Sequence, residues 1–371
     1  MRGRKRYNKR ILIALALVAL LLSLLLLQIL GVFSSSAFGR AFTYRTLGNQ
    51  NHAEVFHFQG QAASTVSVFD NGIALVGHGG LQVYNRAGNL VYFAESSLQN
   101  PVLQVNDTNV LAYDLGGFDV LIGNRRELIH HHHADGRIID AYINANGWLT
   151  LSMEQIGTLG VIHVIDPNGN LRYAVELGTG HVISAKLADD NRTLAVLSMT
   201  TDASRVFWYD INQHGAPLHS VYRMGELVFD FWFTNANGSL ALLSDHAVIH
   251  YTNNGSLQRI YHFEGRHLRG FDTHLGRAVI YLGQGQVGTR GELILFETNG
   301  NTRHLPVVGT LQDLSLNGRF VALLLSEELI LYRNLREYAT LERLELSSGI
   351  LAREDGSIIT VSASRAQIRI P

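Results

Sequence analysis

The chain has 371 residues, of which 46% are hydrophobic and none is cysteine. This composition suits a folded protein with a sizeable core, and it excludes disulfides, cysteine-ligated zinc and thiol catalysis. The first ten residues hold six basic side chains and no acid, which leaves 24 basic and 31 acidic residues in the other 361. Because nucleic acids are bound by basic surfaces, this acidic remainder argues against a nucleic-acid partner.

A long apolar segment follows the basic start of the chain. Residues 11–33 read ILIALALVALLLSLLLLQILGVF, with Ser23 and Gln28 as the polar exceptions. A helix of this length reaches about 34 Å, against roughly 30 Å of membrane hydrocarbon. The segment therefore predicts one transmembrane helix, and the basic residues before it place residues 1–10 in the cytoplasm.

The expected organisation is a cytoplasmic tip at 1–10, a signal-anchor helix at 11–33, a linker at 34–53 and an extracytoplasmic domain at 54–371. An alternative is a cleaved signal peptide, since Ser35 and Ala37 suit a cleavage site, although signal peptides have shorter apolar regions. An exported β domain without cysteine favours a bacterial cell envelope.

Short apolar and aromatic runs separated by Asn-Gly, Asp-Gly and other glycine turns fill the chain after residue 60. They predict an all-β domain. A unit of four strands recurs with spacings of 36 to 46 residues, as in the blades of a β-propeller. The units begin near Thr65, Val102, Ile138, Val182, Val228, Leu268, Leu311 and Ile350.

The two ends of the domain are complementary. The last unit has three strands before Pro371, and Glu54 to Gln59 form an extra strand before the first unit. We expect this extra strand to complete the last blade, which gives a closed ring of eight blades and hides the sheet edges. Seven blades is the alternative.

The turn signals INANG (143–147), ADDNRTLAVLS (188–198) and FTNANGSLALLSD (233–245) lie in the stretch from Ile138 to Leu257. This stretch, with the basic tip and the single span, resembles an uncharacterised Gram-positive family of single-pass membrane proteins, domain of unknown function family 5711. The resemblance implies a membrane-anchored propeller domain of the quinoprotein-like or WD40-like type. It brings no functional residues with it.

Residues 130–133 are four consecutive histidines. On an extended strand, His130 and His132 share one side, and His131 and His133 share the other. Two imidazoles at this spacing could chelate a metal if a third ligand approached, but the simpler interpretation is a solvated strand end. We predict no metal and no cofactor.

Glycines at 283, 285 and 288 match the spacing of a dinucleotide-binding loop. That motif needs a helix after it, whereas the apolar run ELILFE follows here. A loop between the second and third strands of a blade is the expected structure.

Blade connectivity indicates where a ligand would bind. The second-to-third loops and the blade-to-blade connections emerge on one face of a propeller, and the longest of these loops are expected at 153–160, 199–205 and 283–291. Long loops on a rigid ring are common recognition sites. We name His130, His132, Glu154 and Asp202 as a candidate ligand-binding patch, with no catalytic residues assigned.

Two functions remain open. The first is a recognition or scaffolding module that binds an envelope protein, peptide or polymer. The second is a glycan-active hydrolase or lyase with acids at the mouth of the central channel, since paired carboxylates can meet in space without a sequence motif.

Overall fold

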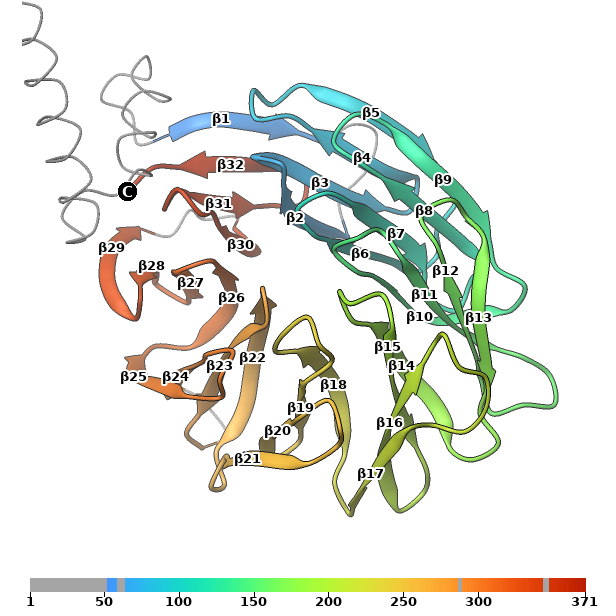
Figure 1. Cartoon of the computed structure of the whole chain (residues 1–371). Helices are drawn as coiled ribbons and strands as arrows, with labels where there is room; N and C mark the ends of the chain where they lie inside the picture. Colours follow the sequence, from blue (N-terminus) through green and yellow to red (C-terminus); the bar gives the residue numbers. More distant parts are fainter. Residues whose placement is uncertain (1–51, 59–63, 286–288, 343–346) are drawn as a thin grey trace, which may run out of the picture.

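The computed structural model describes residues 52–58, 64–285, 289–342 and 347–371. These residues form 32 strands in eight four-stranded antiparallel sheets, arranged as blades around one axis (Figure 1). In each blade the first strand lies nearest the axis and the last strand lies at the rim (Figure 1). The eight-bladed all-β propeller is therefore confirmed.

The first four blades cover residues 65–224. Blade 1 contains β2 (Thr65–Phe69), β3 (Gly72–Gly77), β4 (Gly80–Tyr84) and β5 (Leu90–Glu95), and blade 2 contains β6 (Pro101–Val105), β7 (Val110–Asp114), β8 (Asp119–Gly123) and β9 (Leu128–His133). Blade 3 contains β10 (Arg137–Ile143), β11 (Leu149–Glu154), β12 (Val161–Ile165) and β13 (Leu171–Glu176), and blade 4 contains β14 (His181–Leu187), β15 (Thr193–Met199), β16 (Ala203–Asp210) and β17 (His219–Met224).

The other four blades complete the ring. Blade 5 contains β18 (Val228–Phe233), β19 (Leu240–Ser244), β20 (Ala247–Tyr251) and β21 (Leu257–His262), and blade 6 contains β22 (His267–His274), β23 (Arg277–Gly283), β24 (Arg290–Phe296) and β25 (Thr302–Val308). Blade 7 contains β26 (Leu311–Asn317), β27 (Phe320–Leu325), β28 (Glu328–Arg333) and β29 (Arg336–Glu342), and blade 8 contains β30 (Gly349–Ala352), β31 (Ile358–Val361), β32 (Arg365–Arg369) and β1 (His52–His57).

Blade 8 joins the two ends of the described chain. β1 pairs antiparallel with β32, with Phe56 opposite Ala366. Phe56 is fully buried and packs with Ile73 of blade 1 and Ile359 of blade 8. The sequence predicts the closing strand at 54–59, and the structure has it two residues earlier.

Within the described ranges no helix is long and apolar enough to cross a membrane. The predicted span at 11–33, with the cytoplasmic tip and most of the linker, lies outside these ranges.

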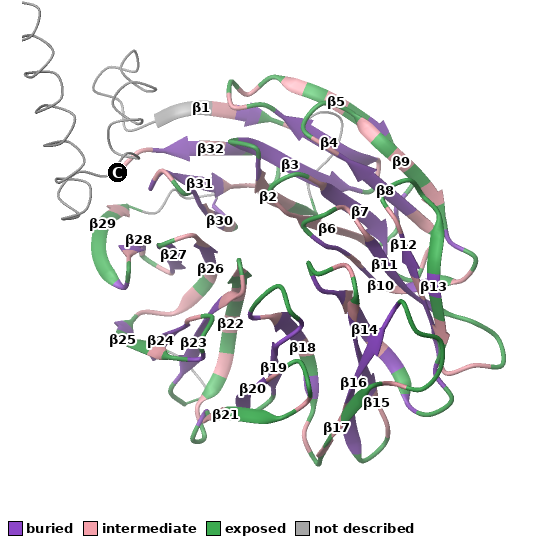
Figure 2. Cartoon of the chain, viewed as in Figure 1, coloured by how far each residue is buried: buried purple, intermediate pink, exposed green. Residues whose placement is uncertain are grey.

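The core consists of eight apolar clusters, and each draws its residues from two neighbouring blades. The middle strands are covered on both sides, so every residue of β3 and β27 is buried. Rim strands such as β9 alternate between half-buried and exposed residues (Figure 2). The apolar runs and the alternating runs in the sequence therefore mark the middle and the rim of each blade.

A five-residue turn joins the third and fourth strands in several blades. In blade 3 the carboxylate of Asp166 accepts hydrogen bonds from the backbone N–H groups of Asn168 and Asn170, both at 2.9 Å. Gly169 has φ 84°, a conformation that glycine adopts without strain. Asn85–Asn89 in blade 1 and Thr252–Ser256 in blade 5 repeat this arrangement.

The connections divide the ring into two faces. Turns from the first to the second strand and from the third to the fourth, such as 166–170, form what we call the hairpin face. Connections from the second to the third strand, such as 155–160, and those between blades form the loop face. β1 is a fourth strand and β32 is a third strand, so β1 begins and β32 ends at the hairpin face, and these two ends lie next to each other (Figure 1).

Candidate functional site

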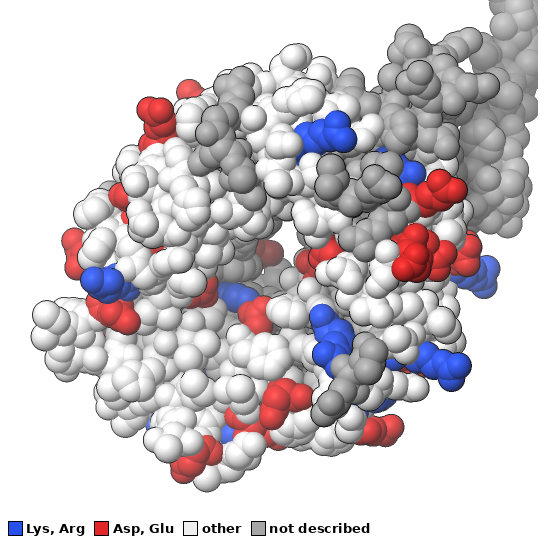
Figure 3. All heavy atoms as spheres, turned by 180° about the vertical axis from the view of Figure 1, so that it is seen from behind, with Lys and Arg blue, Asp and Glu red and all other residues white. Residues whose placement is uncertain are grey.

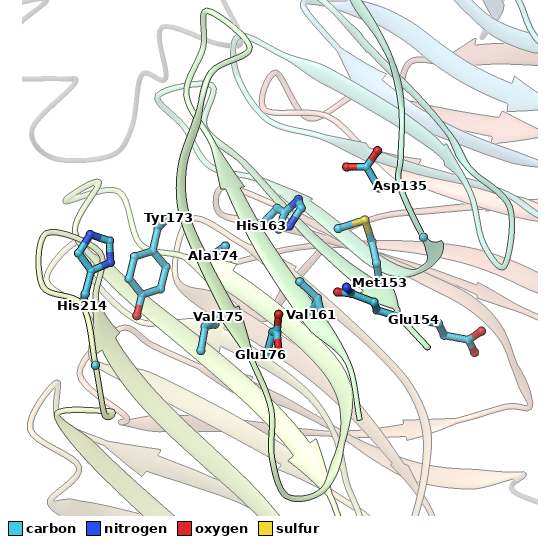
Figure 4. A pocket seen from close by; sticks show the side chains of 13 residues that line it. Asp135, Met153, Glu154, Val161, His163, Tyr173, Ala174, Val175, Glu176 and His214 are labelled. Carbon is cyan, nitrogen blue, oxygen red and sulfur yellow. The ribbon is translucent and has the colours of Figure 1, made fainter. Parts of the chain in front are cut away.

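A groove of about 550 Å³ runs along the rim of blade 3 (Figure 4). β12 and β13 form its floor, and the connection after β9 and the end of β11 contribute further residues. Its lining residues are Asp135, Gly136, Met153, Glu154, Gln155, Val161, His163, Tyr173, Ala174, Val175, Glu176, His214 and Gly215.

Three acidic side chains lie at the loop-face end of the groove. Glu154 and Glu176 are the last residues of β11 and β13, which both run toward the loop face, and Asp135 lies between β9 and β10. All three are exposed. Among the described residues that line the groove, none is Lys or Arg. The groove is therefore acidic at this end.

Two rings shape the other end of the groove. Tyr173 of β13 is buried, and the ring of His214 stacks on it with centroids 6.1 Å apart and planes inclined by 11°. Burial, followed by the charge of Asp210, raises the pKa of Tyr173, so the phenol stays protonated at neutral pH. His214 lies in the eight-residue connection 211–218 between β16 and β17, so blade 4 supplies this wall of the groove.

Two half-buried histidines lie near the acids. Burial lowers the pKa of His163, and the nearby His132 lowers it further, while Asp135 has the opposite effect. Burial also lowers the pKa of His132. Both imidazoles are therefore uncharged at neutral pH, and the acids set the charge of the groove.

The structure distributes the four predicted patch residues over different places. Glu154 lines the groove, and His132 is close enough to influence His163. The Nε2–H of His130 donates to the carbonyl of Pro167 at 3.0 Å, beside a smaller hollow of about 240 Å³ on the hairpin face. Asp202 accepts a hydrogen bond from the Thr200 hydroxyl at 2.9 Å and lines neither cavity. A ligand-binding role for the four residues stays a prediction.

The histidine run alternates along β9 as expected. His131 and His133 both contact Oδ1 of Asp119, at 3.3 and 3.1 Å, whereas His130 and His132 are turned toward blade 3. Burial acts to raise the pKa of Asp119, but hydrogen bonds from the two histidines outweigh it and the pKa is lowered. Across the described ranges, no group of three or more His, Asp or Glu side chains has an arrangement that would hold a metal ion.

The loop face carries the expected second-to-third connections, with one difference. The loop after β11 spans six residues, 155–160, but the loop after β15 spans only 200–202 because β16 already begins at Ala203. The expected long loop at 199–205 is therefore wrong. The glycine-rich stretch at 283–288 begins at the last residue of β23 and is followed by β24, so a strand and not a helix comes after the motif; residues 286–288 lie outside the described ranges.

Polar side chains on the innermost strands link neighbouring blades. Asp140 of blade 3 accepts hydrogen bonds from Ser184 of blade 4 at 2.5 Å and from Tyr113 of blade 2 at 3.0 Å. Nζ of Lys186 in blade 4 lies 2.7 Å from Oδ1 of Asp230 in blade 5. Charged side chains are visible at the margin of the central hollow when the ring is seen from behind (Figure 3).

Two more acidic side chains accept hydrogen bonds from the neighbouring blade. Asp272 of blade 6 accepts from the backbone N–H of Leu316 in blade 7 at 2.7 Å, and Asp313 of blade 7 accepts from the N–H of Ile350 in blade 8 at 2.8 Å. Burial raises the pKa of both acids, that of Asp272 to about 6. These acids satisfy backbone groups on the inner edge of the next blade, which would otherwise lack a partner there.

The sequence singled out Glu154 but none of the other polar groove residues. Asp135, His163 and Glu176 come from three separate segments, and His214 reaches the groove from the neighbouring blade. One signal was available, because acids at the end of a second or fourth strand, such as Glu154 and Glu176, must lie on the loop face.

Comparison with solved structures supports the fold. The C-terminal WD40 domain of Sif2 has 13% sequence identity and a TM-score of 0.59, with 84% of this chain and 97% of that chain covered. Sqt1 from Saccharomyces cerevisiae has 12% identity and a TM-score of 0.59, with 87% and 99% covered. Likeness at this level of identity concerns the fold alone.

No protein with curated annotation matches the sequence significantly. A family defined by its sequences matches residues 43–333, which include blades 1 to 6 and most of blade 7. The match thus spans the groove and both faces of the ring. The chain belongs to this family, described as "Family of unknown function (DUF5711)".

Proposed function

We propose that this protein is a single-pass membrane protein of a bacterial envelope, with its N-terminus in the cytoplasm and its propeller outside. Its loop face binds an envelope protein, peptide or polymer. The propeller fold itself suggests a binding or scaffold role, since its rigid ring presents many loops on one surface. The anchor rests on the apolar segment at 11–33 and the basic residues before it.

One structural observation supports the loop face as the binding surface. The described chain enters the ring at His52 and leaves it at the end of β32, both on the hairpin face. A tether that precedes His52 therefore holds the hairpin face toward the membrane. The loop face is then directed outward, where a partner can reach it.

The loop face also exposes large apolar side chains. Ile156 is 103% exposed, Val308 at the end of β25 is 74% exposed, and Met224 at the end of β17 is 66% exposed. Apolar groups that water surrounds in the free protein lose that hydration when a partner covers them. These three residues are therefore suited to a protein contact.

The three acids on the innermost strands, Asp140, Asp272 and Asp313, favour a binding function over glycan hydrolysis. Glycoside cleavage needs two carboxylates that face the substrate, one as acid and one as base or nucleophile. Asp140, Asp272 and Asp313 instead accept hydrogen bonds from neighbouring blades. A recognition module is the function that these contacts support best.

The absence of cysteine makes the topology directly testable. We would introduce Ile156→Cys on the loop face and, separately, Asn8→Cys in the N-terminal tip. A membrane-impermeant maleimide added to intact cells should label the first variant, and it should label the second only after lysis. Labelling of Asn8→Cys in intact cells, or release of the protein into the medium, would contradict the proposal.

The binding face is tested with the same variant. Ile156→Cys carrying a photo-activated cross-linker should capture a discrete envelope component, and Asn253→Cys, an exposed position on the hairpin face, serves as the matched control. Capture through Asn253→Cys alone would rule out the loop face.

A further inference from the structure

We propose that the groove along β13 accepts an extended, basic segment of a partner protein, which adds to the free edge of blade 3. This inference rests on the proposed recognition function and deepens it. It specifies the place of contact, the backbone conformation of the partner and the sign of its charge.

The edge of β13 is the first element of the argument. The strand order of blade 3 is β10-β11-β12-β13, so within the described ranges no strand lies beyond β13. An edge strand presents backbone N–H and C=O groups outward, and an extended peptide can pair with them. Main-chain pairing of this kind supplies affinity with little demand on the partner's sequence.

The groove beside β13 offers a peptide more than a strand edge. The 211–218 connection of blade 4 brings His214 over Tyr173, which closes one end of the depression. The volume of about 550 Å³ falls within the roughly 300–1,000 Å³ of typical ligand sites. A peptide lying along β13 would thus contact side chains as well as the strand edge.

Charge decides which segment fits. Asp135, Glu154 and Glu176 lie together at the loop-face end, and no Lys or Arg lines the described groove. Basic side chains of a bound strand would pair with these carboxylates, whereas an anionic polymer would be repelled. The alkyl groups of Val161 and Val175, which also line the groove, favour apolar residues at alternate positions of the same segment.

The probe is an acetylated and amidated eight-residue peptide of alternating Val and Arg with a fluorescent label. Its binding to the full-length protein in detergent micelles is measured by anisotropy. The triple variant Asp135→Asn, Glu154→Gln, Glu176→Gln should bind about tenfold more weakly, as expected for the loss of three partly exposed charge pairs. Glu95→Gln removes the acid at the equivalent end of β5 in blade 1 and should bind as the unaltered protein does.

A second probe tests the edge pairing without altering the protein. The same peptide with N-methyl groups at alternate amides keeps its charges but cannot form the strand ladder, so its binding should be lost. Equal binding of the methylated peptide would overturn edge addition, and equal binding by the triple variant would overturn the charge argument. Displacement of the peptide by N-acetylglucosamine oligomers would indicate a glycan site instead. Any of these failures leaves labelling and capture through Ile156→Cys unaffected, so the proposed function is judged separately.

Discussion

The two faces of the ring are made by the same strands but differ in what their side chains do. On the hairpin face, side chains reach from one blade to the next: Asn144 donates to Ala188, Arg259 to Gly300 and Arg353 to Asn71. On the loop face, Ile156 and Met224 are largely exposed. The hairpin face holds the ring together, and the loop face is left available for contacts.

This difference predicts that changes on the hairpin face affect folding, whereas changes on the loop face affect binding.

The largest effect is expected at the joint between blades 8 and 1. Arg353 is 3% exposed, and its guanidinium donates to the carbonyl of Asn71 at 2.6 Å and to the Ser357 hydroxyl at 3.1 Å. Arg353→Met should lower the free energy of unfolding by about 3 kcal/mol, because buried acceptors lose a charged donor.

Urea unfolding of the full-length protein in detergent, followed by tryptophan fluorescence, measures this loss. Arg126→Met, an exposed position in a turn of the same face, should change stability by no more than about 0.5 kcal/mol. Equal stability of the two variants would mean that the hairpin face does not secure the closure.

A smaller effect is expected where blades 3 and 4 meet. Asn144 is fully buried, and its Nδ2 donates to the carbonyl of Ala188 at 3.1 Å and to Oδ1 of Asn191 at 2.8 Å. Asn144→Ala should cost about 2 kcal/mol in the same unfolding measurement. Asn253→Ala, an exposed turn position in blade 5, is the control, and a comparable loss there would contradict a specific role for the buried amide.

Acid should lower the free energy of unfolding through His250, which lies near the hairpin face. This side chain is 3% exposed beside Phe296, and burial lowers its pKa to about 4. Between about pH 6.5, the pKa of an unperturbed histidine, and pH 4, the unfolded state binds more protons, so stability falls as the pH falls. His250→Gln should reduce the stability lost between pH 7 and 4.5 by about 2 kcal/mol.

Asp272 should have the opposite effect on the pH dependence of stability. Its pKa is raised to about 6, so the folded state binds more protons below this value and gains stability as the pH falls. Asp272→Asn should therefore make the protein more sensitive to acid. If His250→Gln and Asp272→Asn changed the dependence of stability on pH in the same direction, one of the two pKa shifts would be wrong.

The smallest effect on stability is expected on the loop face. Ile156→Ser removes a side chain that contacts solvent throughout, so the free energy of unfolding should change by less than about 0.5 kcal/mol. Capture of the partner should nevertheless fall when a cross-linker is placed at neighbouring Gly157. A large loss of stability without loss of capture would mean that Ile156 supports folding and not binding, contrary to the role proposed for the loop face.

The blades were predictable because each strand run ends at a turn with its own chemistry. The eight predicted unit starts agree with the structure within one residue, from Thr65 to Gly349. Contacts between blades were not predictable in this way. Lys186, the single lysine after Lys9, pairs with Asp230 of the next blade across 44 positions, and no local pattern encodes that distance.

The groove was missed for the same reason. Period-two alternation identifies which residues of β13 share a side, but it does not show that His214 of blade 4 covers Tyr173. The loop expected at 199–205 is shorter because Ala203 and Ser204 pair with Met224 and Arg223 and extend β16.

The closure of blade 8 by β1 also sets the order in which the protein can be made. β1 leaves the ribosome before any other strand of the ring, yet its partner β32 is within the last seven residues of the chain. During synthesis β1 therefore waits through seven blades without its sheet, and contacts between such distant residues form slowly. For a chain tethered to a membrane before the first blade, that delay leaves an unfinished edge close to the lipid surface, where a chaperone of the envelope would have its first opportunity to act.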